Sequence, residues 1–121
     1  MSTSNSAPLS TEYCDLLKLL GYLYLQSGRP EGAATLFNAL HAVDPDEQHA
    51  AISLACAYIR CGKPTEALSL LDQLQDHDHV SALTHLLRSQ ALISLKRTAE
   101  AARSMRVFVM TRATESRKEE F

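Results

Sequence analysis

The sequence has no excess of charge of either sign and no long hydrophobic run. Twelve Lys and Arg residues stand against 14 Asp and Glu residues, so the net charge is −2 and no basic face for nucleic acid is expected. The longest apolar run, residues 16–25, is interrupted by Lys18 and is too short to span a bilayer. Residues 1–8 contain no apolar segment, so no secretory signal is predicted. We therefore expect neither a nucleic-acid partner nor membrane insertion.

Motifs that carry chemistry are also missing. The three cysteines (Cys14, Cys56 and Cys61) are an odd number without Cys-x-x-Cys spacing, which we interpret as buried thiols in a reducing cytosol. There is no glycine-rich phosphate loop, no His-Glu-x-x-His and no clear nucleophile–histidine arrangement. Residues 76–79 (Asp-His-Asp-His) contain metal-ligating residue types, but four consecutive residues do not readily converge on one ion. We predict no enzyme, no cofactor and no metal site.

What the sequence does contain is a repeated pattern. The segment Leu20-Gly21-Tyr22-Leu23-Tyr24 returns as Leu54-Ala55-Cys56-Ala57-Tyr58, and a glycine turn follows each copy. Four identical pairs are each 34 positions apart: Tyr24 and Tyr58, Gly28 and Gly62, Pro30 and Pro64, Ala33 and Ala67. The small residues Gly21 and Ala55 correspond in the same way. Ala101 continues the pair of Ala33 and Ala67 into a third copy, in which Lys96 stands where the turn glycine belongs. A 34-residue period with these residue types is typical of tetratricopeptide repeats.

The residue types in the pattern have a physical reason. Small residues let two antiparallel helices approach closely, and the tyrosines fill the space beside them. Gly28 and Gly62 supply the left-handed residue that ends the first helix of each pair, and Pro30 and Pro64 begin the second. The sequence therefore predicts an all-α array of about three helix-turn-helix pairs, a tetratricopeptide-repeat solenoid.

The expected boundaries follow from this pattern. We predict a disordered tail over residues 1–9, a repeat domain over 10–113 (repeats 14–47, 48–79 and 80–113) and a charged tail over 114–121. Ser10 or Thr11 is expected to cap the first helix, which ends near Ser27. Asp44 is expected to cap the third helix, with Pro45 at its first position and Glu47 completing a capping box. Thr98 is expected to cap the last helix, and fraying is expected from residue 111.

The first helices of such pairs line a concave groove. The repeat register places these residues in the groove: Lys18, Tyr22, Leu25, His49, Ile52, Cys56, Ile59, Leu83, Leu86, Gln90 and Ile93. Most are apolar, which favours an apolar partner segment as the normal occupant. The alternative is that the domain closes partly on itself, or forms a homodimer, and so buries these side chains.

One known type of groove can be tested in the sequence. Repeat domains that bind the acidic C-termini of heat-shock proteins resemble one another in a clamp of Lys, Asn and Arg. Lys18 matches the first basic position, but Tyr22 replaces the Asn, and Leu83 and Leu87 stand where a basic pair belongs. The sequence therefore argues against a carboxylate clamp.

The layout resembles the small repeat chaperones of bacterial type III secretion, and it is most similar to the SctY (YscY-like) family. The likeness is carried by residues 16–47, including Leu25-Gln26-Ser27-Gly28, and by residues 86–109, through Ser89-Gln90-Ala91; the second repeat fits the generic pattern better. The resemblance implies a protein of the bacterial cytoplasm that binds a small helical secretion protein of the SctX type. For sister chaperones the partner would be a needle subunit or a translocator. A non-secretory repeat scaffold or homodimer is the alternative from another class.

Overall fold

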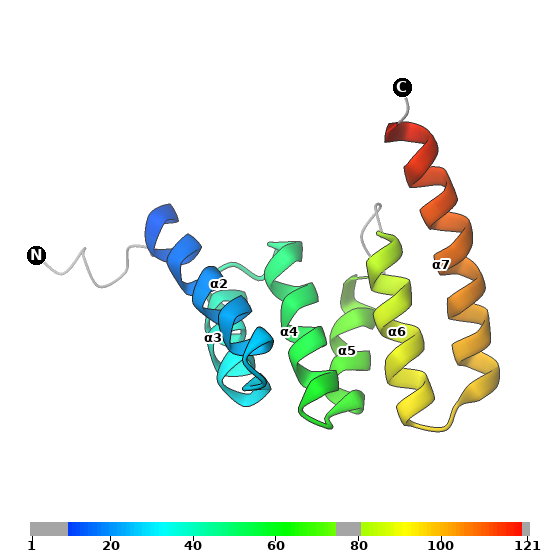
Figure 1. Cartoon of the computed structure of the whole chain (residues 1–121), viewed down its shortest axis with the longest axis horizontal. Coiled ribbons are helices and arrows are strands. Elements are labelled where there is room, and N and C mark those ends of the chain that lie inside the picture. Colours follow the sequence, from blue (N-terminus) through cyan, green and yellow to red (C-terminus); the bar gives the residue numbers. More distant parts are fainter. Residues whose placement is uncertain (1–9, 75–80, 120–121) are drawn as a thin grey trace, which may run out of the picture.

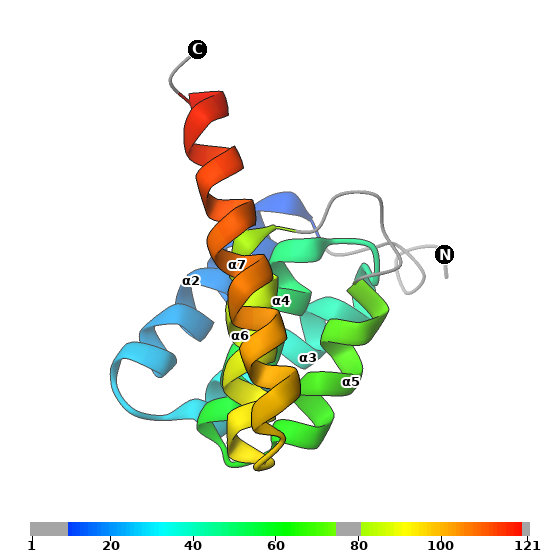
Figure 2. The ribbon, with the colours of Figure 1, turned by 90° about the vertical axis from the view of Figure 1, so that its right-hand side faces the viewer.

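The computed structural model describes residues 10–74 and 81–119, which form six helices (Figure 1). The helices are α2 (Thr11–Gln26), α3 (Pro30–Val43), α4 (Gln48–Arg60), α5 (Pro64–Leu74), α6 (Ala82–Ser94) and α7 (Thr98–Glu119). Each packs against the next in chain order, and α4 also contacts α6. Helices α2, α4 and α6 lie side by side in one layer, with α3 and α5 behind them (Figures 1 and 2). The predicted all-α array of helix pairs is confirmed.

The three turns between paired helices share one geometry. Gly28 and Gly62 have φ angles of 75° and 76°, and Lys96 has a φ of 62° although it carries a side chain. In each turn the residue that follows the left-handed one donates its N–H to the carbonyl five residues earlier: Arg29 to Tyr24 at 2.8 Å, Lys63 to Tyr58 at 2.8 Å and Arg97 to Leu92 at 2.9 Å. This pattern satisfies the free carbonyls at a helix end. The third repeat thus keeps the same turn, although the left-handed conformation strains the backbone of Lys96.

Replacing Lys96 by Gly should raise the free energy of unfolding by about 1 kcal/mol, because a left-handed conformation strains any residue with a Cβ atom. Replacing Gly28 by Val should lower it by about 1–2 kcal/mol for the same reason. A Cβ atom at Gly28 would meet nothing within 4 Å, so the effect would report backbone strain alone. Urea unfolding followed by circular dichroism measures both. An unchanged or reduced stability of Lys96→Gly would contradict the strain.

The core lies where the two layers meet. It includes the small residues Ala33, Ala55 and Ala67, none of which is exposed to solvent, and Ala101, which is 3% exposed. Gly21 is the one buried residue of α2, and a Cβ atom there would lie 2.6 Å from Cζ of the fully buried Phe37. Helices α2 and α3 can therefore pack at this distance only because Gly21 has no side chain.

The start of α4 differs from the prediction. The helix begins at Gln48, and Glu47 rather than Asp44 is its N-cap, because the Glu47 carboxylate accepts the N–H groups of His49 and Ala50. Asp44 instead caps the C-terminus of α3. Pro45 lies in the turn between the two helices, which a bond from the Glu47 N–H to the Asp44 carbonyl closes at 3.2 Å.

The last helix also differs from the prediction. It does not fray from residue 111 but continues to Glu119, and Thr98 is its first residue rather than its cap. Residues 111–119 contain neither Gly nor Pro, and Oε2 of Glu115 accepts the Ala82 N–H at 3.2 Å, so α7 pairs with the start of α6. The division into a repeat domain and two tails stays a prediction. The expected tail at 1–9 and the segment at 76–79 lie outside the described residues.

Candidate functional site

The predicted groove residues lie on the layer formed by α2, α4 and α6. We call this surface the groove face and define it by these residues: Lys18, Tyr22, Leu25, His49, Ile52, Cys56, Ile59, Leu83, Leu86, Gln90 and Ile93. Leu25, Ile52, Cys56 and Ile59 are half-buried and pack against the core. Leu83 and Ile93 are 49% and 56% exposed, and Tyr22 is 41% exposed. The face therefore has a half-buried apolar floor with more exposed apolar side chains at α2 and α6.

The repeat register explains why these side chains form rows. Residues 34 positions apart occupy equivalent places on parallel helices of the same layer. One row is aliphatic in all three helices: Leu25, Ile59 and Ile93. The row that begins at Lys18 continues with Ile52 and Leu86. The row that begins at Tyr22 continues with Cys56 and Gln90, so neither row keeps one residue type. A partner that crosses the three helices would follow the continuous aliphatic row.

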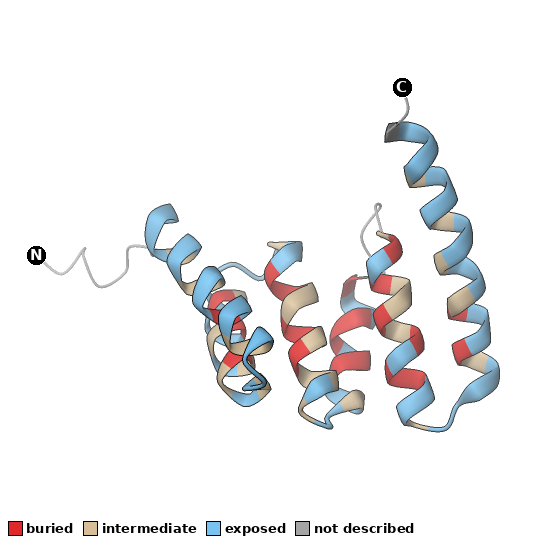
Figure 3. Cartoon of the chain, in the orientation of Figure 1, coloured by how far each residue is buried: buried red, intermediate tan, exposed pale blue. Residues whose placement is uncertain are grey.

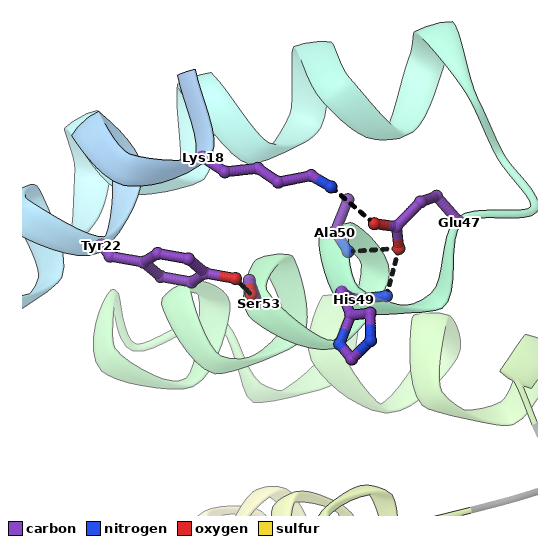
Figure 4. A network of polar contacts seen from close by, with 6 residues as sticks. All are labelled: Lys18, Tyr22, Glu47, His49, Ala50 and Ser53. Carbon is purple, nitrogen blue, oxygen red and sulfur yellow. Dashed lines mark hydrogen bonds and ion pairs between the residues drawn. The ribbon is translucent and has the colours of Figure 1, made fainter. Parts of the chain in front are cut away.

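Tyr22 is held in place from two sides. Its ring packs on Phe37 of α3, with the ring centroids 5.3 Å apart and the planes tilted by 50°. Its hydroxyl accepts a hydrogen bond from Oγ of Ser53 on α4 at 3.4 Å (Figure 4). Because a rigid aromatic side chain loses little entropy when it is covered, Tyr22 is suited to anchor a partner.

Lys18 is joined to Glu47 at the edge of the groove face. The Lys18 Nζ lies 2.8 Å from Oε1 of Glu47, while Oε2 of the same carboxylate accepts the N–H groups at the start of α4 (Figure 4). Burial raises the pKa of Glu47, but the hydrogen bonds from Lys18, Ala50 and His49 outweigh it and lower that pKa below its usual value. The hydrogen bond to Glu47 in turn raises the pKa of Lys18. One carboxylate thus caps α4 and ties it to α2.

Replacing Glu47 by Gln should lower the free energy of unfolding by about 1 kcal/mol at pH 7, because the cap and the partly exposed ion pair are both weakened. The folded state lowers the pKa of Glu47, so this stabilisation is complete above the ordinary value of 4.5 and is lost as the pH falls through the lower folded value. Denaturant unfolding of both proteins from pH 7 to pH 3 tests this. Lys18→Met, which keeps the cap, should have a smaller effect; a pH-independent difference would contradict the linkage.

Three contacts of this face were missed by the sequence analysis. Glu47 and Ser53 belong to it through Lys18 and Tyr22, and no local pattern in the sequence signals either pairing. Arg60, on α4, donates from Nη1 to the Leu25 carbonyl at 3.3 Å and so joins α4 to the end of α2. All three are bonds between α2 and α4 or its cap, so the first two repeats form a connected part of the face.

A pocket of about 310 Å³ lies between α2, the end of α3 and the start of α4, and its polar wall is formed by Asp15, Lys18, Asp44 and Glu47. Over residues 10–74 and 81–119, no three His, Cys, Asp or Glu side chains are grouped so as to hold a metal ion. The three cysteines are free and half-buried. Among the described helices, none is both long and apolar enough to cross a membrane.

Comparison with known protein families gives a match over part of the first repeat, the second repeat and part of the third. Residues 24–91 match the family described as tetratricopeptide repeat, and this match covers more than half of the chain. It extends from the last turn of α2 to the last turn of α6 and so contains the whole second repeat. No curated protein matches the sequence.

Proposed function

The chain belongs to the tetratricopeptide repeat family, and on that premise we propose that its groove face binds an amphipathic helix of a protein partner. The tetratricopeptide fold is a protein-interaction fold that presents an extended binding surface. The partner's apolar side would cover the groove face, and its polar side would remain in water. The described residues that would make this contact come from three helices, so the domain must be folded before it can bind.

The observation that carries the proposal is the exposure of large apolar side chains on this face. Leu83 and Ile93 are about half exposed although they adjoin the half-buried Ile59 and Leu86. Covering the exposed half of such a side chain contributes about 1 kcal/mol. Several of them in adjacent rows would support a stable complex, and a patch of this kind is typical of an interaction surface.

The finer proposal is a chaperone of bacterial type III secretion that acts in the cytoplasm. It is supported by the resemblance of residues 16–47 and 86–109 to the SctY family and by the apolar character of the groove face. The partner would be a small SctX-like protein, with a needle subunit or a translocator as the alternatives. By covering the partner's apolar side before export, the chaperone would keep the partner from assembling early.

Co-expression with each candidate partner tests this proposal. We expect one of the SctX-like protein, needle subunit or translocator to co-purify with the chain as a complex of equal stoichiometry, measured by light scattering. Recovery of the chain without any of the three would contradict the chaperone function and favour a non-secretory repeat scaffold.

The native cysteines provide a map of the bound surface. Cys56 lies on the groove face, so a partner present at about ten times its Kd should slow its alkylation by about tenfold. Cys61 lines a hollow formed with Glu31 and Thr35 of α3 and should react equally fast with or without partner. Burial raises the pKa of the Cys61 thiol, so each cysteine is compared with itself and not with the other. Protection of Cys61 but not of Cys56 would place the partner elsewhere.

A further inference from the structure

A second apolar surface lies on α2, on the side that faces away from α4. Tyr13, Leu16, Leu19, Leu20 and Leu23 are each between 36% and 59% exposed. Tyr13, Leu16, Leu20 and Leu23 have the 3–4–3 spacing that forms one stripe along a helix. Leu19 adjoins this stripe on the side nearer the groove face. We call these five residues the end stripe; in Figure 3 most of α2 is coloured as exposed.

The repeat register indicates that the end stripe is a helix-packing surface that none of the described helices covers. In α4 the positions equivalent to Leu16, Leu20 and Leu23 are Ala50, Leu54 and Ala57, and each is at most 2% exposed. These residues belong to a core cluster that also contains Phe37 and Leu40 of the preceding helix, α3, and Ala50 lines a pocket together with Leu40. Among the described residues, no helix precedes α2. The same positions that are covered in the second repeat are therefore open in the first.

A head-to-tail stack of copies does not cover the end stripe well. At the α5–α6 junction Asp72 pairs with Arg88, and the equivalent residues in α7 and α2 are Arg106 and Leu20. Stacking α7 of one copy on α2 of the next would place the Arg106 guanidinium against Leu20. An unpaired charge buried on an apolar surface is costly. The occupant must instead be apolar where Leu20 lies.

A second copy of the end stripe meets this requirement. We propose that two copies pair through their α2 helices in antiparallel orientation and form a two-fold symmetric homodimer. Tyr13 of each copy then lies opposite Leu23 of the other, and Leu16 lies opposite Leu20, so each of these four residues finds an apolar neighbour. Glu12, Leu19 and Gln26 form the row at one flank of the stripe, and in the antiparallel pair this row faces its own copy. Glu12 therefore lies nearest Gln26 of the other copy and not another acid, and the two helix dipoles point in opposite directions. A parallel pair would instead bring Glu12 and Asp15 of both copies to one end.

This dimer leaves the groove face open. On α2, Lys18, Tyr22 and Leu25 lie on the opposite side of the helix from Leu16 and Leu20, as the 100° rotation per residue requires. A homodimer through the end stripe can therefore hold a partner in each groove. The proposal does not depend on the proposed function, because it rests on a different surface.

Sedimentation equilibrium of the full chain, at concentrations up to about 1 mM where even a weak dimer is populated, tests the proposal. We expect a dimer for the wild type. Leu16→Lys should weaken it by about 30-fold or more, the effect of losing a central interface residue. Leu16 is 59% exposed, so circular dichroism should show an unchanged fold. The matched control Ile93→Lys, on the groove face and 56% exposed, should leave the dimer intact.

Mixing two variants tests the orientation. Leu16→Lys and Leu20→Glu should each be monomeric alone, but an equal mixture should form a heterodimer, because antiparallel pairing sets the new Lys opposite the new Glu. Parallel pairing would set each charge against a leucine and give no recovery. A monomeric wild type, a dimer broken by Ile93→Lys but not by Leu16→Lys, or two monomeric variants that do not recover when mixed would each overturn the proposal. Partner binding that fails while the dimer persists would count only against the proposed function.

Discussion

Replacing Phe37 by Ala is expected to lower the free energy of unfolding by about 3–5 kcal/mol, the loss typical of truncating a fully buried aromatic side chain. Phe37 has no solvent exposure, and its ring joins α3 to α2 through Gly21 and Tyr22. Truncation would leave a cavity at the one place where α2 contributes a buried residue. Denaturant unfolding measured by circular dichroism gives the value, and Val109→Ala, at a site 58% exposed, provides the control.

A pair of variants shows whether the ring and Gly21 form a single unit. Gly21→Ala should destabilise the wild type, because the new Cβ atom would lie 2.6 Å from Cζ of the Phe37 ring. In a Phe37→Leu background that end of the ring is missing, so the same change should stabilise by about 1 kcal/mol through helix propensity. Equal effects of Gly21→Ala in both backgrounds would contradict direct packing.

The repeat architecture could be predicted from the sequence because it rests on local residue types. A 34-residue offset relates Gly28 to Gly62, and those positions need a left-handed conformation in the structure. The same offset located the third turn at Lys96, where the sequence has no glycine. Packing of the helix pairs fixes this turn, so an unfavourable residue is tolerated. For the position of this turn, the 34-residue register was therefore a better guide than the identity of the residue.

The helix boundaries could not be predicted where two local signals compete. Asp44 and Pro45 together form a strong helix-start signal, yet the chain uses Glu47, whose carboxylate also binds Lys18, 29 positions earlier. The end of α7 likewise depends on the contact between Glu115 and Ala82, 33 positions apart. A window of neighbouring residues contains neither partner. Both errors come from contacts that only the folded chain creates.

The candidate site, too, could be predicted only in part. The register could place residues on a face, because the face follows from helical rotation, but it could not say how deeply each side chain is inserted. Ile52 and Cys56 pack against the core, whereas Leu83 and Ile93 do not reach it. Substitution at Ile52 would therefore change both stability and binding. Substitutions at Leu83 and Ile93 of α6 should change binding without changing stability, because these side chains do not pack against the core.

Replacing Ile93 by Asp, or Leu83 by Asp, should weaken partner binding by about 30-fold or more, because each leaves an unpaired carboxylate beneath the apolar side of the bound helix. The stability of the free domain should change by no more than about 0.5 kcal/mol, since both side chains are about half exposed. Tyr22→Asp should also abolish binding, with an added loss of stability from its contact with Phe37. Isothermal titration calorimetry with the co-purified partner measures the affinity.

Met110→Asp is the matched control for these variants, because Met110 is 69% exposed on α7 and lies outside the groove face. It should bind the partner as the wild type does. Ile52→Asp, in contrast, should lose stability as well as affinity, because Ile52 packs against the core. If Ile93→Asp and Leu83→Asp bind normally while Met110→Asp does not, the partner contacts α7 and the groove face is not its site. Loss of binding at α6 with a preserved fold would instead assign the aliphatic row of Leu25, Ile59 and Ile93 to the partner.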